Sequence, residues 1–156
     1  MKKITPCLWF DFHAEEAIEY YGTIFPDLEI LSVNRYPEGA PGLAGKVVTL
    51  QFRMAGQEFI AINGGPMYKF TEAVSFSIDC KNQGEIDYYW ERLTAGGEES
   101  MCGWLKDRYG LSWQVVPTEL GSLLHSPDPE VARKVMDAML KMRKLDIGVL
   151  KSAAGG

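Results

Sequence analysis

Histidine and cysteine are scarce in this sequence. The 156 residues include only two histidines and three cysteines. The three cysteines, Cys7, Cys80 and Cys102, are odd in number and widely spaced, which argues against a disulfide framework and favours a reducing cytoplasm. The histidines are confined to His13 and His125, from which no Ser-His-Asp order can be built, so a serine hydrolase is not expected.

An excess of positive charge and a long apolar run are also missing. The net charge is -5, from 16 basic and 21 acidic residues, which argues against nucleic acid as a partner. No apolar stretch approaches the roughly 20 residues that a membrane span needs, so no membrane insertion is expected. Near the N-terminus, Pro6, Asp11 and His13 interrupt the apolar core that a signal peptide requires. The composition favours a soluble globular domain.

A weak repeat is present at an offset of 68 residues. The stretch LWFDFHAEEAIEYYGTIF (8–25) aligns with FSIDCKNQGEIDYYWERL (76–93), and both contain an aspartate followed by a Tyr-Tyr pair. Two copies are too few for a solenoid. We therefore expect one domain over residues 1–125, built from module one (1–68) and module two (69–125).

The same order of elements is expected in each module, namely strand, helix and three strands. Apolar alternation and helical spacing set the boundaries of the expected strands and helices. Ala55-Gly56 and residues 107–110 are expected to form turns between strands, and Gly96-Gly97 is expected to end a helix. The fold class predicted is α+β. The expected strands are 4–11, 28–36, 45–54, 57–63, 73–80, 98–103, 104–110 and 112–117, and the expected helices are 14–25 and 83–95.

Residues 126–156 form a separate tail of the same domain. Asp128 is expected to cap a C-terminal helix and Pro129 to take its first position. Val131, Val135 and Met139 follow at near-helical spacing. Packing of this helix on the domain surface is favoured over a lid or a partner-binding helix, and a dimer contact through the methionines is a further alternative.

Three segments together resemble a known family. ITPCLWFDFHAEEAIEYY, GGEESMCGWLKDRYGLSWQVVP and DPEVARKVMDAMLKM are similar to the PhnB-like family, whose members are often labelled 3-demethylubiquinone-9 3-methyltransferase. The repeat resembles the vicinal oxygen chelate superfamily of glyoxalase I, extradiol dioxygenases and the fosfomycin- and bleomycin-resistance proteins. The resemblance implies two βαβββ modules whose U-shaped sheets enclose a cavity in an open barrel, with helices outside, and a homodimer.

Strand alternation predicts which side chains face that cavity. Val74, Phe76 and Ile78 are large and apolar and should pack under a helix, so the intervening serines face the cavity. Ser112, Gln114 and Val116 share one face of the last strand. The predicted ligand-binding residues are Thr5, Cys7, Trp9, Ser75, Ser77 and Gln114.

No metal cofactor is predicted. Alignment with metal-dependent members of the superfamily places the ligand positions near Thr5, Ile60, Ala73 and Gln114, which include no histidine and no carboxylate. Glu72 is adjacent to one position, so an enzyme that binds a divalent metal through Glu72 and Gln114 remains the alternative. The methyltransferase label is disfavoured because the chain lacks the glycine-rich loop between a strand and a helix that common S-adenosylmethionine enzymes use.

The leading hypothesis is a protein that binds a small apolar or aromatic molecule, without cofactor and without conventional catalysis. Trp9 would stack on the ligand, and Ser75, Ser77 and Gln114 would form hydrogen bonds to it. Cys102 is expected to be structural, and Cys7 is the better thiol candidate. A dimer with a structural or regulatory role, in which the tail binds the partner, is a further alternative.

Overall fold

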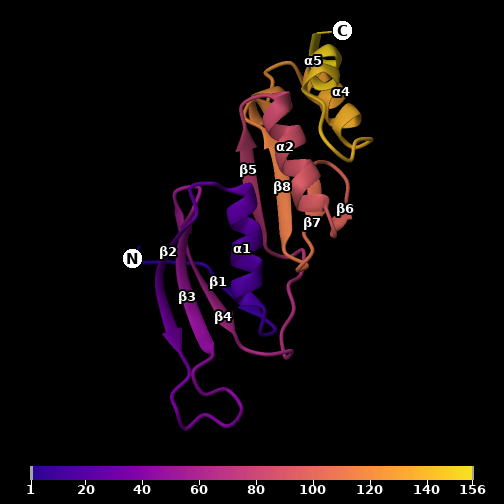
Figure 1. Cartoon of the computed structure of the whole chain (residues 1–156). Helices are drawn as coiled ribbons and strands as arrows, with labels where there is room; N and C mark the ends of the chain where they lie inside the picture. Colours follow the sequence, from indigo (N-terminus) through magenta and orange to yellow (C-terminus); the bar gives the residue numbers. More distant parts are fainter. Residues whose placement is uncertain (1, 156) are drawn as a thin grey trace. The chain divides into compact units, whose positions relative to one another are not determined.

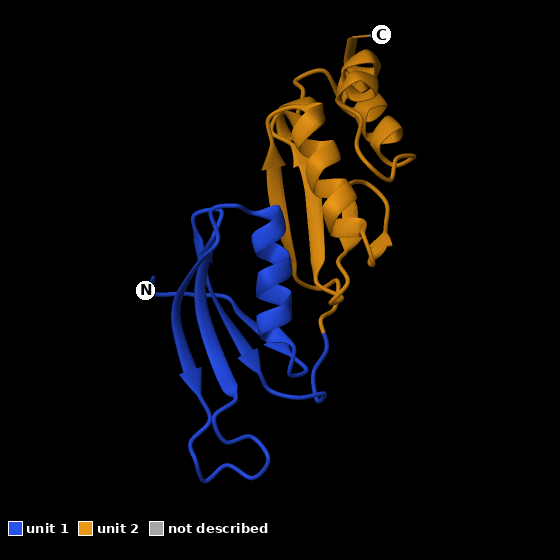
Figure 2. Cartoon of the chain, viewed as in Figure 1, with its two compact units in different colours: residues 1–69 blue, residues 70–156 orange. Residues whose placement is uncertain are grey.

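The computed structural model describes residues 2–155, and Figure 1 follows the chain through them. The chain divides into two compact units, unit 1 (residues 1–69) and unit 2 (residues 70–156), which Figure 2 colours separately. Each unit contains one four-stranded sheet with a helix packed on it. Neither sheet closes on itself.

The sheet of unit 1 has the order β1-β4-β3-β2. β1 (Cys7–Phe10) runs parallel to β4 (Gln57–Asn63), whereas β4 with β3 (Val47–Met54) and β3 with β2 (Glu29–Arg35) are antiparallel. Helix α1 (Ala14–Ile24) packs on one face. That face carries the alternating apolar side chains, so Leu8 and Phe10 are buried while Cys7 and Trp9 lie on the other face.

Helix α1 is capped by a residue that is distant in sequence. His13, at its N-cap position, makes no side-chain capping bond. Instead Asn63, at the end of β4, accepts a hydrogen bond from the Ala14 N–H at 2.9 Å. The Asn63 amide also donates to the Glu15 carboxylate and to the Val47 carbonyl. One buried side chain therefore joins the helix start to two strands.

Unit 2 repeats the topology of unit 1, because its sheet has the order β5-β8-β7-β6 with the first pair parallel. The strands are β5 (Ser75–Cys80), β6 (Glu98–Glu99), β7 (Trp104–Lys106) and β8 (Ser112–Pro117), and the helix is α2 (Gln83–Thr94). Asn82 caps α2 by accepting from the Glu85 N–H at 2.9 Å, and Gly96 follows its end with φ +78°. The repeat predicted from the sequence is thus confirmed as two α+β arrangements with the same strand order.

The tail packs within unit 2. It contains α3 (Leu120–Leu124), α4 (Pro129–Met139) and α5 (Ile147–Gly155). Asp128 caps α4 by accepting from the Glu130 N–H at 2.9 Å, as predicted. Val135, Leu145 and Leu150 are fully buried in a cluster of their own. The prediction that α4 packs on the domain surface is consistent with this cluster.

Several local predictions differ from the structure. The strand expected at 98–103 is reduced to Glu98–Glu99, because Cys102 and Gly103 turn with positive φ values. Val74 does not pack under a helix, since it precedes β5 and is 64% exposed. The tail contains α5 in addition to the expected helix, and His125 ends the short helix α3 rather than lying in an open loop. Within residues 2–155, no helix has both the length and the apolarity to cross a membrane.

Candidate functional site

The face of the unit 2 sheet that points away from α2, here called the open face, carries mostly polar side chains. The opposite face is filled by Leu105, Trp113 and Val115, which are all buried. On the open face, one row crosses the sheet through residues that pair in register. This row consists of Glu98, Lys106, Ser112 and Ser75. The next row consists of Trp104, Gln114 and Ser77.

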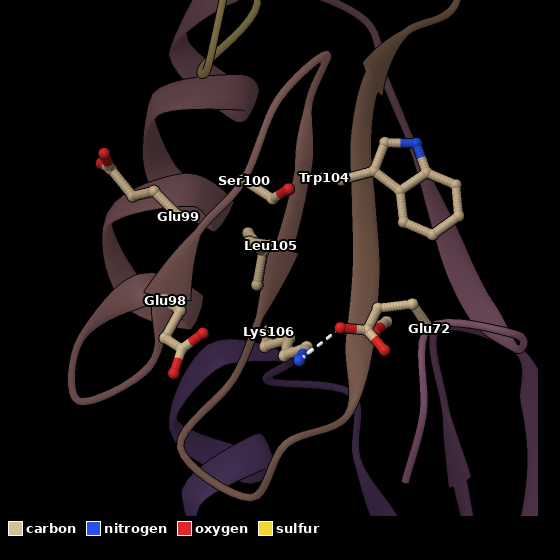
Figure 3. A pocket seen from close by; sticks show the side chains of 8 residues that line it. Glu72, Glu98, Glu99, Ser100, Trp104, Leu105 and Lys106 are labelled. Carbon is tan, nitrogen blue, oxygen red and sulfur yellow. Dashed lines mark ion pairs between the residues drawn. The ribbon is translucent and has the colours of Figure 1, made fainter.

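A pocket of about 140 Å³ lies at these rows. Figure 3 shows the pocket from close by, with the Lys106 and Glu72 side chains directed toward one another. The residues that line it are Glu72, Glu98, Glu99, Ser100, Trp104, Leu105, Lys106 and Ser112. All of them belong to unit 2, so the pocket is a property of this unit alone.

An ion pair between Lys106 and Glu72 borders the pocket. The hydrogen bond from Lys106 holds the pKa of the Glu72 carboxyl below its usual range, and the same bond raises the pKa of Lys106. Glu98, the cross-strand neighbour of Lys106, acts in the same direction on the pKa of Lys106 through its charge. Lys106 is therefore a firmly protonated donor rather than a base at neutral pH.

Ser112 differs from the other residues around the pocket. Its side chain is only 1% exposed, and its hydroxyl oxygen is buried without a hydrogen-bond partner among the described residues. A buried hydroxyl without a partner costs roughly 1–3 kcal/mol relative to a satisfied one. Native structures contain few such groups, and those that occur commonly bind a water molecule or a ligand. Ser112 is therefore the polar group of the pocket wall that lacks a partner among the described residues, and a group from outside the chain would reach its oxygen only after neighbouring side chains move.

The Glu99 carboxylate, in contrast, is already engaged. The Trp90 indole N–H donates to it at 3.0 Å, and the Arg143 guanidinium lies 3.6 Å away. Figure 3 shows Glu99 directed away from the Lys106–Glu72 pair. Glu99 thus supports the position of β6 rather than offering a free charge to a ligand.

The three site residues predicted in module two lie on the open face. Ser77 is exposed and Ser75 and Gln114 are half-buried. The Gln114 amide donates to the Ser75 hydroxyl oxygen at 3.0 Å, so these two residues are in contact. The sequence pattern did not single out Trp104 and Lys106 as site residues. The apolar Leu105 between them was the available signal in the sequence, because alternation then places both on the open face.

The three site residues predicted in module one lie in unit 1. Cys7 and Trp9 are on the face of the sheet that points away from α1, and Thr5 precedes β1. The Trp9 indole N–H donates to the Gly65 carbonyl at 2.8 Å, and its ring meets the Tyr68 ring edge-on at 5.0 Å. Trp9 is therefore held by its own unit. The convergence of all six residues on one ligand stays a prediction.

A wider pocket in unit 1 measures about 750 Å³ and contains none of the predicted residues. It lies against the start of α1 and the strand ends around the loop 37–46. Phe12, Arg35 and Lys46 are among the side chains that line it, and all three are exposed. Its buried polar side chain, Asn63, is already hydrogen-bonded to Ala14, Glu15 and Val47, so we regard the unit 2 pocket as the stronger candidate.

Neither Cys7 nor Cys80 has the environment of an activated thiol. Burial raises the pKa of Cys80 to about 12, with the charges of Glu85 and Asp79 adding to the effect. Partial burial also raises the pKa of Cys7, which weakens the case for Cys7 as a nucleophile. Within residues 2–155, no three side chains of the His, Cys, Asp and Glu types lie together as a metal site would require.

Comparison with known proteins identifies the relatives of the chain. Residues 2–116 match the model of a family described as 3-demethylubiquinone-9 3-methyltransferase. A PhnB protein from Bacillus cereus, named as a member of the same group, is 37% identical, and the match covers 74% of this chain and 99% of that one with a TM-score of 0.67. No curated protein sequence matches.

More distant structures share the fold. A protein from Pseudomonas aeruginosa is 21% identical over 75% of this chain and 98% of that one, with a TM-score of 0.58. The fosfomycin resistance protein FosX from Listeria monocytogenes, in a complex with Mn(II) and sulfate, is 15% identical over 86% of this chain and 98% of that one, with a TM-score of 0.52.

Proposed function

The chain belongs to the family described as 3-demethylubiquinone-9 3-methyltransferase, within the vicinal oxygen chelate superfamily, and on that premise we propose that it binds a small organic molecule on the open face of unit 2. The ligand enters the pocket beside Lys106 and Ser112 and extends over the row of Trp104, Gln114 and Ser77. An aromatic or apolar body suits Trp104, and polar atoms suit the serines and the amide.

The observation that carries this proposal is the buried Ser112 hydroxyl, which has no partner in the part of the chain that the structure describes. Among the described residues, no other buried side-chain oxygen or nitrogen lacks a partner, and the half-buried Gln114 and Ser75 bond each other. A pocket that combines such a hydroxyl with a half-exposed tryptophan and a lysine offers both contact area and hydrogen-bond donors. These features suit a site for a small organic molecule.

Methyl transfer is not part of the proposal. The family description names a reaction but does not by itself show that this chain performs it, and the pairs Gly64-Gly65 and Gly96-Gly97 have structural roles. Gly64 lies so close to the Trp9 ring that a Cβ there would overlap it, and Gly96 ends α2 with a positive φ. Neither pair opens a helix after a strand in the way that a phosphate- or nucleoside-binding loop does.

A metal-dependent reaction, for which the manganese complex of FosX is the precedent, does not fit these residues. Of the four positions aligned with metal ligands, Ile60 and Ala73 have no side-chain donor atom, and Thr5 and Gln114 are neutral. The Gln114 amide is bonded to Ser75, and the nearby Glu72 is paired with Lys106. Divalent cations are held in proteins by several carboxylate, carbonyl or imidazole donors, which these positions do not supply, so we derive no step through a metal.

A fragment screen followed by NMR tests the proposal. We expect small aromatic fragments to shift the backbone amide signals of β7 and β8, and we expect the affinities to be the same with added Mn²⁺ and with a chelator. Trp104→Ala is the test variant, and Tyr88→Ala on helix α2, which does not line the pocket, is the control. Fragments that shift only unit 1 or the tail, or that require the metal, would contradict the proposal.

A further inference from the structure

We infer that the ligand carries a single carboxylate, which binds the Lys106 ammonium and the Ser112 hydroxyl in place of the Glu72 carboxylate. This inference rests on the proposed function and adds the chemical class of the ligand. The exchange requires no covalent step, because one carboxylate partner of Lys106 replaces another.

Lys106 and Ser112 are hydrogen-bond donors in a pocket whose other lining residues include three carboxylate acceptors, Glu72, Glu98 and Glu99. Lys106 and Ser112 pair in register across β7 and β8, and Ser112 pairs in register with Ser75 of β5. The Ser75 oxygen already accepts from Gln114, which leaves its hydroxyl proton for another acceptor. An ammonium and two hydroxyls in one row therefore suit a group that accepts several hydrogen bonds, as a carboxylate does.

The protonation state of Lys106 indicates ligand binding rather than nucleophilic catalysis at this pocket. A serine beside a lysine could suggest a nucleophile with a general base, but such a lysine needs a lowered pKa. Here the bond to Glu72 raises the pKa of Lys106, so the side chain stays protonated and cannot take a proton from Ser112. The pair is thus suited to holding an anionic oxygen rather than to attacking a substrate.

Glu72 is placed so that it can be displaced. It lies before β5, outside any strand, and its side chain is 62% exposed against 35% for Lys106. Exposed ion pairs contribute little to stability, so breaking this one costs little. A ligand carboxylate would restore the charge pairing of Lys106 and would also satisfy Ser112, which the Glu72 carboxylate does not reach.

The remaining acidic residues restrict the charge of the ligand. Glu98 lies opposite Lys106 on β6 and is exposed, and Glu99 is held by Trp90 and Arg143. One lysine among these carboxylates can accommodate one negative charge, whereas a dianion such as phosphate would meet repulsion. The pocket of about 140 Å³ is also small, so it takes the charged end of a ligand while the body lies toward Trp104.

Benzoate and benzamide provide the test, because they have nearly the same shape and differ in charge. We would titrate each into the ¹⁵N-labelled full chain and follow β7 and β8 by NMR, which detects millimolar binding. Benzoate is expected to bind more tightly than benzamide, and inorganic phosphate more weakly than benzoate.

Lys106→Met should weaken benzoate binding by about tenfold, as the loss of one charge-assisted hydrogen bond implies. The exposed Lys81→Met is the matched control and should leave both affinities unchanged.

Two further variants complete the experiment. Glu72→Gln should tighten benzoate binding severalfold, because it removes the competing carboxylate from Lys106. Ser112→Ala should weaken benzoate binding while the amide spectrum of the free protein stays that of a folded chain. Equal binding of benzoate and benzamide, unchanged by Lys106→Met, would overturn the carboxylate inference and leave the proposed aromatic site intact. If neither compound shifts β7 or β8, both the inference and the proposed location fail.

Discussion

Replacing Asp107 with alanine is expected to lower the free energy of unfolding by about 4–5 kcal/mol, since three hydrogen bonds to a charged group are lost and each contributes at least about 1.5 kcal/mol. Asp107 is 3% exposed and holds the turn between β7 and β8. Its carboxylate accepts from the backbone N–H groups of Tyr109 and Leu111 at 2.8 and 3.1 Å and from the Trp113 indole N–H at 2.9 Å. The alanine variant would leave these donors unsatisfied, and urea denaturation would measure the loss.

Asp79→Ala is the matched control for this experiment. Asp79 lies on β5 of the same sheet but is exposed. We expect its replacement to change the unfolding free energy by less than about 0.5 kcal/mol, as for most surface substitutions. Equal losses for the two variants would show that Asp107 does not hold the turn that positions Lys106 and Ser112.

Asn63→Ala is expected to destabilise the protein by about 2–3 kcal/mol, which combines the loss of a helix cap with that of buried hydrogen bonds. The side chain is 3% exposed and replaces the missing N-cap bond of α1 by accepting from Ala14. It also donates to Val47, whose carbonyl would lose this partner. Chemical denaturation followed by far-UV circular dichroism would measure the effect.

Asn82→Ala provides the comparison, because Asn82 caps the equivalent helix α2 from the ordinary N-cap position and is exposed. Its replacement should cost only about 1 kcal/mol, as is usual for a solvent-exposed cap. If Asn63→Ala cost no more than Asn82→Ala, the buried bonds from β4 would not contribute to unit 1 as we describe.

The fold could be predicted from the sequence because the apolar patterns of the strands and helices and the repeat of 68 residues indicated the same order of elements. The Tyr-Tyr pairs placed two helices 68 residues apart, and apolar alternation placed the strands around them. The turn at Ala55-Gly56 was predicted from its residues, and the structure gives both a positive φ. The α+β class and the family resemblance are both confirmed.

The predicted and observed elements differ where contacts between distant segments override the local sequence pattern. Val74 continues the alternation of β5, yet the strand begins at Ser75 and Val74 stays exposed. The segment 98–103 has the composition of a strand, but the backbone N–H groups of Cys102 and Gly103 donate to Met142 and Arg143 in the tail rather than to a neighbouring strand. Such long-range bonds have no signature in the sequence around Cys102.

The candidate site was predicted in part. Alternation placed Ser75, Ser77, Ser112 and Gln114 on one face, and the structure places them there. Lys106 was not among the predicted site residues, and its pairing with Glu72 joins residues that are far apart in sequence. The buried state of the Ser112 hydroxyl depends on the three-dimensional packing around it and could not be predicted from the sequence.

Locating the strongest-binding fragment by intermolecular nuclear Overhauser effects tests the proposed site most directly. We expect Overhauser effects between the fragment protons and both the Trp104 ring and the Lys106 side chain, and we expect the effects to Lys106 to weaken in Trp104→Ala. Effects to Phe12 and Val47 of the unit 1 pocket, or to α4 and α5, with none to β7, would contradict the site described for unit 2.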